Sequence, residues 1–177
     1  MLSNKLINRE DVATYKQISY TVHDDKFNEI LFDTQIQDIA PLLGERLFND
    51  ILENTDNYND LLDGGLYTCN DISYQNYGLK AVVVYYFDAR YKMFGSAVDT
   101  PFSLVEKLDN EGKSQPASYK LKESMYQLNR DSAFTIWKSV ENYLIRTDNE
   151  LFRYHTLGYG CETKRNQNQS FKIKNIR

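Results

Sequence analysis

The segment from Asp24 to Leu52 constrains the fold more than any other part of the sequence, because it contains two helical patterns and a break between them. Asp24 and Asp25 stand where the start of a helix needs acceptors for its unpaired N–H groups. Pro41 lacks a backbone donor and Gly44 permits a left-handed turn, so we expect the chain to change direction there. Apolar residues at intervals of three or four predict one buried helical face, made of Phe32, Ile36, Ile39, Leu43 and Leu47.

Residues 78–94 include the run VVVYYF, which taken alone favours a buried strand. The flanks favour a helix instead, because Asp88 and Lys92 form an acid-before-base pair at the spacing that stabilises helices, and Lys80 lies on the same face. A second row contains Leu79, Val82, Tyr86, Ala89 and Met93. We therefore expect a helix that is buried on most sides and is the central element of a bundle.

Between these helical segments, residues 54–78 are dense in Asn, Asp, Gly and Tyr. Asn and Asp side chains bond to their own backbone and Gly accepts unusual dihedral angles, so this composition predicts a long connection with room for one short helical turn. Residues 98–113 alternate in polarity and end in a turn cluster, which predicts one strand or one arm of a hairpin that projects from the helices.

The last helix is expected to begin near Ser114 and Pro116, which suit an N-cap and a first turn, and to continue to about Arg146. At 1.5 Å per residue this helix is roughly 45 Å long, which exceeds what the core needs. Its predicted buried row is Leu121, Met125, Leu128, Ser132, Ile136 and Val140, with Trp137 beside it.

Together these patterns predict a mainly α protein, a small bundle of about four helices with a projecting β arm or hairpin and an extended C-terminal tail. Residues 1–157 form the helical domain, with the arm near 98–113, and residues 158–177 form the basic tail. Near the end of the tail, Phe171 and Ile173 alternate with Lys172 and Lys174, which predicts a strand without a partner in its own fold.

Charge is distributed unevenly along the chain. The net charge is −4, but residues 162–177 carry five cations and one anion, a net +4, which leaves −8 for the remainder. An acidic body with a basic tail suits head-to-tail contact between copies, or contact with nucleic acid. A solvated terminus is the alternative.

Sequence motifs for catalysis or metal binding are absent. The two histidines, His23 and His155, and the two cysteines, Cys69 and Cys161, lack metal-ligand spacing, and no phosphate-binding loop or nucleophile elbow occurs. In the acidic segment of residues 54–65, Tyr58 occupies a position at which a calcium site needs an oxygen ligand. We therefore expect no catalytic residue, cofactor or metal, and a protein that is not an enzyme. The sequence shows no membrane anchor or signal peptide, so we expect a soluble, intracellular chain at synthesis.

Four stretches carry a family resemblance: ILFDTQIQDIAPLLGERLFNDIL, YGLKAVVVYYFDARY, TPFSLVEKL and SVENYLIR. Their order and spacing, from about Asp24 to Arg146, resemble those of the small helical head-to-tail adaptor proteins of tailed bacteriophages, also called connector or head-completion proteins. The likeness is nearest to versions from crAss-like and other phages of Bacteroidetes. None of the four stretches is a catalytic motif.

The resemblance implies a structural virion protein at the head–tail junction, present in the host cytoplasm during assembly. Such proteins form a ring, commonly a dodecamer, that binds the portal protein and the next tail or ring protein around the DNA channel. We expect contacts with other subunits or the portal from the arm and the tail. The residues are Phe102, Leu104, Val105, Phe171, Ile173 and Ile176.

Two alternatives remain open. The basic residues Lys164, Arg165, Lys172 and Lys174 could face DNA, weakly in an adaptor channel or more strongly in a nucleic-acid-binding or packaging accessory protein. The second alternative is a tail-completion protein, which also forms a ring but lies lower on the particle.

Overall fold

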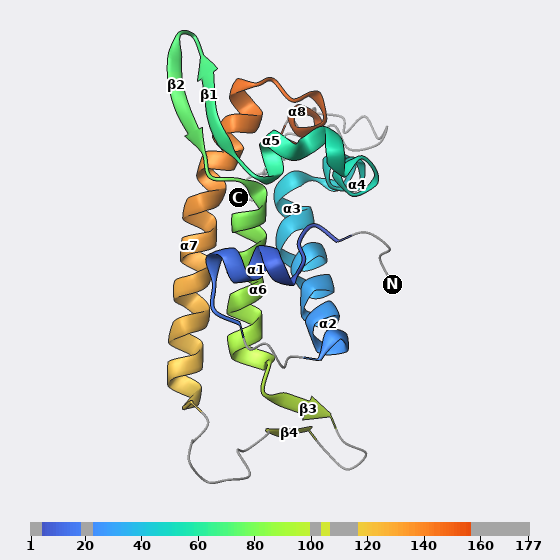
Figure 1. The fold of residues 1–177 in the computed structure, drawn as a ribbon, viewed down its shortest axis with the longest axis vertical. Helices are drawn as coiled ribbons and strands as arrows, with labels where there is room; N and C mark the ends of the chain where they lie inside the picture. Colours follow the sequence, from blue (N-terminus) through green and yellow to red (C-terminus); the bar gives the residue numbers. More distant parts are fainter. Residues whose placement is uncertain (1–4, 19–22, 100–103, 107–116, 157–177) are drawn as a thin grey trace, which may run out of the picture.

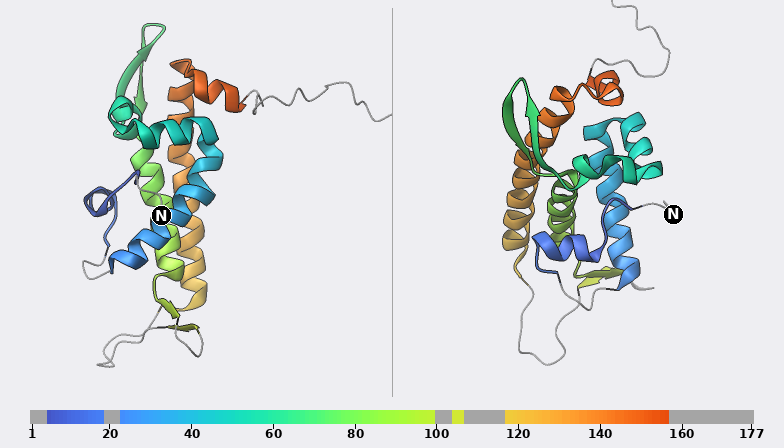
Figure 2. Two further views of the ribbon diagram at one scale, coloured as in Figure 1. Left: turned by 90° about the vertical axis from the view of Figure 1, so that its right-hand side faces the viewer. Right: turned by 45° about the horizontal axis from the view of Figure 1, so that its top comes forward.

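The computed structural model describes residues 5–18, 23–99, 104–106 and 117–156, and most of these residues are helical (Figure 1). The predicted mainly α fold with a projecting β arm or hairpin is confirmed, and Figure 2 shows the helical body from two further sides. No helix in this described part of the chain has the length and apolar content to cross a membrane. The elements, in chain order, are α1 (Arg9–Tyr15), α2 (Asp24–Thr34), the π-helix η1 (Gln35–Ile39), α3 (Ala40–Leu43), α4 (Glu45–Glu53), the 3₁₀ helix η2 (Thr55–Tyr58), α5 (Asn59–Leu62), β1 (Gly65–Cys69), β2 (Ile72–Asn76), α6 (Leu79–Phe94), β3 (Ala97–Asp99), β4 (Leu104–Glu106), α7 (Tyr119–Arg146) and α8 (Glu150–Thr156).

Helix α6 lies at the centre of the molecule, as the sequence predicted. Helix α7 runs along one side of α6, α2 and η1 lie on the other, and α1 crosses it (Figure 1). Val82, Val83 and Val84 are all fully buried, although they point in different directions around the helix. Contact on several sides explains why this strand-like run is helical, because each β-branched side chain finds a packing partner.

The first helical segment starts at Asp24 as expected, and the predicted break lies at Gly44 alone. Helical structure continues through Pro41, which lies in α3, the helix that directly follows the π-helical turn η1. The direction changes at Gly44, whose φ of 78° favours glycine. Asp24 and Asp25 occupy the first turn of α2, where acidic groups complement the helix dipole.

The predicted buried face of this segment is wrong in its first half. Phe32 and Ile36 are 45% and 40% exposed, whereas the rest of that row is buried. The face that meets the core instead includes Thr34, Gln35 and Asp38. Gln35 accepts a hydrogen bond from the backbone N–H of Leu6, at 2.9 Å. Polar residues occupy core positions here because each has a partner that the hydropathy pattern does not reveal.

Helix α7 begins later than predicted and turns a different face to the core. Ser118 caps it, accepting a hydrogen bond from the N–H of Leu121, while 114–116 lie outside the described residues. The predicted core residues Leu121 and Leu128 are 51% and 66% exposed. The predicted row is displaced, because polar and small residues hold some core positions. The buried residues of α7 are Asn129, Ala133, Trp137, Val140 and Leu144.

The long connection predicted over residues 54–78 is wrong, since it contains η2, α5 and a complete β hairpin. β1 pairs antiparallel with β2 through a two-residue turn. Asn70 and Asp71 in that turn have φ of 51° and 60°, the conformation that the twist of a tight hairpin requires. At the hairpin base, a Cβ on Gly64 would lie 2.5 Å from the carbonyl oxygen of Asn76, so only glycine fits.

A second hairpin projects from the opposite end of the molecule, where the sequence predicted an arm. β3 and β4 pair antiparallel, with Val98 opposite Val105 and Asp99 opposite Leu104. The two hairpins therefore extend from the two ends of the long axis of the bundle (Figure 1).

Candidate interaction surface

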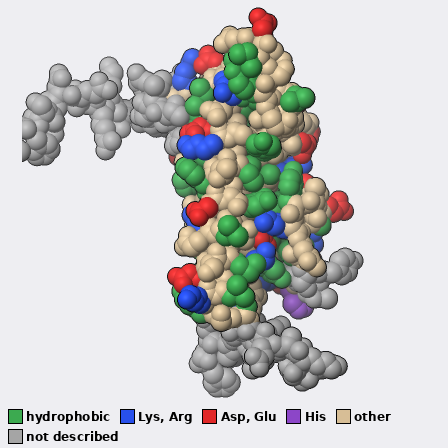
Figure 3. Space-filling model, turned by 90° about the vertical axis from the view of Figure 1, so that its left-hand side faces the viewer, with side chains coloured by type: hydrophobic (Ala, Val, Ile, Leu, Met, Phe, Trp, Pro, Cys, Tyr) green, Lys and Arg blue, Asp and Glu red, His purple; other side chains and the backbone are tan. Residues whose placement is uncertain are grey.

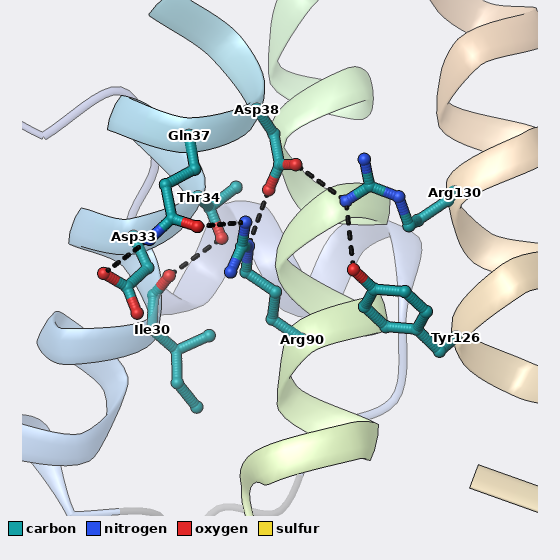
Figure 4. A network of polar contacts seen from close by, with 8 residues as sticks. All are labelled: Ile30, Asp33, Thr34, Gln37, Asp38, Arg90, Tyr126 and Arg130. Atoms are coloured by element: carbon teal, nitrogen blue, oxygen red, sulfur yellow. Dashed lines mark hydrogen bonds and ion pairs between the residues drawn. The ribbon is translucent and has the colours of Figure 1, made fainter. Parts of the chain in front are cut away.

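The inner sides of α2–η1, α6 and α7 are joined by a buried ion cluster centred on Asp38 (Figure 4). The Asp38 side chain is only 2% exposed. Its Oδ2 accepts a hydrogen bond from Arg90 Nε on α6 at 2.6 Å, and its Oδ1 accepts one from Arg130 Nη1 on α7 at 2.7 Å. One carboxylate therefore fixes three elements that are far apart in the sequence.

The two arginines of this cluster have further partners. Arg90 donates to Gln37 Oε1 at 3.1 Å, and Arg130 donates to the hydroxyl of Tyr126 at 3.3 Å. The Arg130 guanidinium also lies over the ring of Tyr86, 5.1 Å from its centroid. Burial is the largest single influence on Arg130 and disfavours its charge, but the hydrogen bond to Asp38, the charge of Asp38 and the nearby Tyr126 and Tyr86 together outweigh burial and raise the pKa of Arg130. The cluster is satisfied and structural, because its charges are paired with one another.

A second buried carboxylate, Asp88, lies on another face of α6. Its Oδ2 accepts a hydrogen bond from Lys92 at 2.6 Å and is 3.9 Å from Lys16 Nζ. Lys16 also donates to Asn129 of α7 at 2.9 Å and lies over the ring of Tyr85. This contact ties the segment after α1 to both long helices.

The outer side of α7 differs from this polar interior, because it exposes large apolar residues. Twelve large hydrophobic residues are exposed in the part of the chain that the structure describes, and eight of them belong to α7 or to the adjacent β1–β2 region. Hydrophobic side chains occur along the whole length of this side (Figure 3). We call it the α7–hairpin surface, and its exposed apolar residues are Leu66, Ile72, Tyr77, Tyr119, Leu121, Leu128, Phe134 and Ile145.

Aromatic packing joins the hairpin to the C-terminal part of α7. The ring of Tyr67 meets that of Tyr143 edge-on at 5.0 Å, and the Arg146 guanidinium lies 3.7 Å from the centroid of Tyr74. Arg146 also donates to the hydroxyl of Tyr67 at 2.9 Å, and Ser139 Oγ accepts from the N–H of Tyr77 at 3.1 Å. These contacts hold the hairpin firmly against α7, so the two elements present one continuous surface.

The interaction residues predicted from the sequence do not lie on the α7–hairpin surface. Some lie at the other end of the molecule, and the rest are not among the residues that the structure describes. Leu104 and Val105 are in β4, at the end of the molecule opposite the β1–β2 hairpin. Phe102 lies outside the described residues. The predicted tail residues also lie outside them, and these are Lys164, Arg165, Phe171, Lys172, Ile173, Lys174 and Ile176. Sequence reasoning missed the α7–hairpin surface. Phe134 and Ile145 were the available signal, because both are apolar and fall off the predicted core row.

These features define a helical protein whose one long side exposes large apolar residues among polar ones and whose interior is locked by ion pairs. A family model matches residues 39–167, and the chain belongs to that family, which is described as a family of unknown function, DUF6712. The match includes α6, α7 and the β1–β2 hairpin. No curated protein and no solved structure matches the chain.

Proposed function

We propose that this chain is a structural virion protein that forms a ring at the portal–tail junction of a tailed phage. In this role it connects head to tail around the DNA channel and contacts the portal protein and the next tail component. The observation that carries the proposal is the α7–hairpin surface. Eight large apolar side chains are exposed there, and this many exposed apolar residues on one side favour a surface that another protein covers.

The arrangement of the apolar residues supports a ring rather than a symmetric pair. The α7–hairpin surface lies on one side of α6, and α2 and η1, with exposed Phe32 and Ile36, lie on the other (Figure 1). Two different surfaces on opposite sides suit a head-to-tail interface, in which each subunit offers one surface to each neighbour. A closed ring covers both surfaces in every subunit and leaves none of them unpaired.

Quantitative mass spectrometry of virions purified from a phage that encodes this chain tests the proposal. A ring protein at the junction is expected at near-equal abundance with the portal protein, because stacked rings have comparable numbers of subunits. The chain's absence from the particle would contradict the proposal.

The basic tail favours a second candidate, a nucleic-acid-binding or packaging accessory protein. Lys164, Arg165, Lys172 and Lys174 lie in a stretch of net charge +4. A mobility shift with double-stranded DNA at physiological salt separates the two functions, since an adaptor gives little shift and an accessory protein gives a clear one. If these residues bind phosphates, replacing them flattens the salt dependence of binding.

A further inference from the structure

The outer face of α2 combines acidic and apolar residues in one stripe. Asp25, Glu29 and Asp33 recur at intervals of four, and the same side carries Phe32 of α2 and Ile36 of η1, which continues α2. The Glu29 side chain is 63% exposed, and the two apolar residues are exposed as described above. These five residues, which we call the α2 stripe, face away from the core formed by Phe27, Ile30 and Leu31.

The local contacts of the acidic residues leave them able to accept more hydrogen bonds. Glu29 pairs with Lys26 at 3.2 Å, and Asp33 accepts one bond from Gln37 at 3.3 Å. A carboxylate has about four acceptor sites. Helix α2 contains four acidic residues and one lysine, and Asp24 is paired with Arg9 at 2.8 Å, so the charge that remains on α2 is −2. An occupant of the stripe must therefore be cationic and must also bring apolar side chains.

One segment of this chain has that composition. Residues 171–177 read FKIKNIR, with three cations, no anion and three large apolar residues in close alternation. Its side chains carry a charge of +3, which is opposite in sign to the −2 that remains on α2. The α7–hairpin surface offers no such match, because exposed lysines on α7 are interspersed with exposed Glu123 and Asp131. Charge complementarity therefore directs this segment to the α2 stripe.

We propose that the α2 stripe is the docking surface for residues 171–177 of a second copy of this chain. Phe171 lies fifteen positions after Thr156, the last residue that the structure describes, and such a length can span up to about 50 Å. The segment thus has the reach to contact a neighbouring molecule. That the stripe belongs to a second copy rests on the ring proposed above. The match between residues 171–177 and the α2 stripe rests on their charge and apolar content and is independent of the ring.

Zero-length carbodiimide cross-linking of the full chain tests the contact directly. Equal amounts of ¹⁴N- and ¹⁵N-labelled protein are mixed before the reaction, and the linked peptides are read by mass spectrometry. We expect amide links from Lys172 or Lys174 to Glu29 or Asp33, with about half of them joining a light peptide to a heavy one. The intramolecular pairs Lys26–Glu29 and Lys138–Glu141, at 3.2 and 2.7 Å, are the internal control and are expected to carry one isotope only.

Charge exchange provides the second test, also on the full chain. One variant carries Glu29→Lys and Asp33→Lys, and the other carries Lys172→Glu and Lys174→Glu. Each variant alone loses the self-association that analytical ultracentrifugation measures in the wild type. Mixing the two restores it, because every contact between unlike copies then pairs opposite charges, while contacts within one copy stay repulsive. Glu53→Lys, at an exposed position of α4 outside both the α2 stripe and the α7–hairpin surface, is the matched control and leaves self-association unchanged.

The inference is overturned if the links between the tail and the α2 stripe carry a single isotope, or if they do not form while the control pairs do. It is also overturned if the mixture of the two charge-exchange variants fails to associate. If the chain is present in virions at the abundance of the portal protein but lacks these links, only the docking inference fails. If the chain is absent from virions and the mixed-isotope links form, the docking inference stands and the proposed function fails.

Discussion

Two regions of this protein reverse the usual distribution of polarity. One is the interior junction of α2–η1, α6 and α7, and the other is the outer side of α7. Inside, Asp38 is bound by Arg90 and Arg130 and is almost inaccessible to water. Outside, Leu128 and Phe134 are at least half exposed. Charged groups usually lie at the surface and large apolar residues inside. Within one chain the inner arrangement is complete, because both arginines bind Asp38, whereas the outer apolar residues contribute little stability while they are exposed to water.

The two regions serve different purposes. An ion cluster with directional bonds holds three helices in one relative position, which apolar contacts alone specify less strictly. That rigid frame keeps the α7–hairpin surface in a defined shape, and preorganised surfaces lose less entropy on binding. Changes inside are therefore expected to act on stability, and changes outside to act on association.

The largest effect is expected from Asp38→Ala. The substitution leaves the Arg90 and Arg130 guanidinium groups partly buried without their anion, which costs about 3–5 kcal/mol of unfolding free energy. Urea denaturation followed by circular dichroism measures the change. Asp25→Ala, on the exposed face of α2, is the control and changes stability by less than about 0.5 kcal/mol. Equal effects of the two substitutions would mean that the Asp38 cluster does not hold the helices.

A smaller effect is expected from Lys16→Met, which removes one of the two cations near Asp88. Lys92 remains bound to Asp88 at 2.6 Å, so the carboxylate keeps a partner, and the loss is about 1–2 kcal/mol, mainly from the bond to Asn129. The same denaturation measurement applies. A loss as large as that of Asp38→Ala would show that Lys92 does not compensate.

Lys16 also makes stability depend on alkaline pH. Burial lowers the pKa of Lys16 below its ordinary value of 10.5, although Asp88 opposes the shift. Between the lowered pKa and 10.5, the unfolded chain binds more protons than the folded chain, so this residue's contribution to stability increases as the pH rises through that window. Denaturation of the wild type and of Lys16→Met at several pH values gives the contribution as a difference, and a constant difference would contradict it.

The smallest effect on stability is expected on the outside, from Leu128→Ser combined with Phe134→Ser. Both side chains are exposed, so each substitution changes the unfolding free energy by less than about 0.5 kcal/mol. Association is expected to decrease strongly, because the apolar surface that a neighbour covers is reduced. Analytical ultracentrifugation measures it, with Gln127→Ser on the same helix as control. Unchanged association with both serines present would exclude these residues from the interface.

Local patterns were sufficient for some elements and insufficient for others. The Asp88–Lys92 spacing identified α6 as a helix against the strand preference of VVVYYF, and the structure shows the bond that this spacing implies. The β1–β2 hairpin was missed, although Asn70 and Asp71 between two short runs rich in aromatic and β-branched residues carried a hairpin signal. Its rigid attachment through Arg146 was beyond local patterns, because the partners are separated by 79 positions.

The sequence by itself determined the helical class, the central place of α6 and the reversal near Gly44, because backbone hydrogen bonding and dihedral limits depend on neighbouring residues. Only the tertiary structure decided which face of each helix is buried. Asp38 and Asn129 lie inside and Leu128 lies outside, against their hydropathy. The physical reason is that a polar group is tolerated in the core only when it has a partner, and the partners of Asp38 and Asn129 come from distant segments, on Arg90, Arg130 and Lys16.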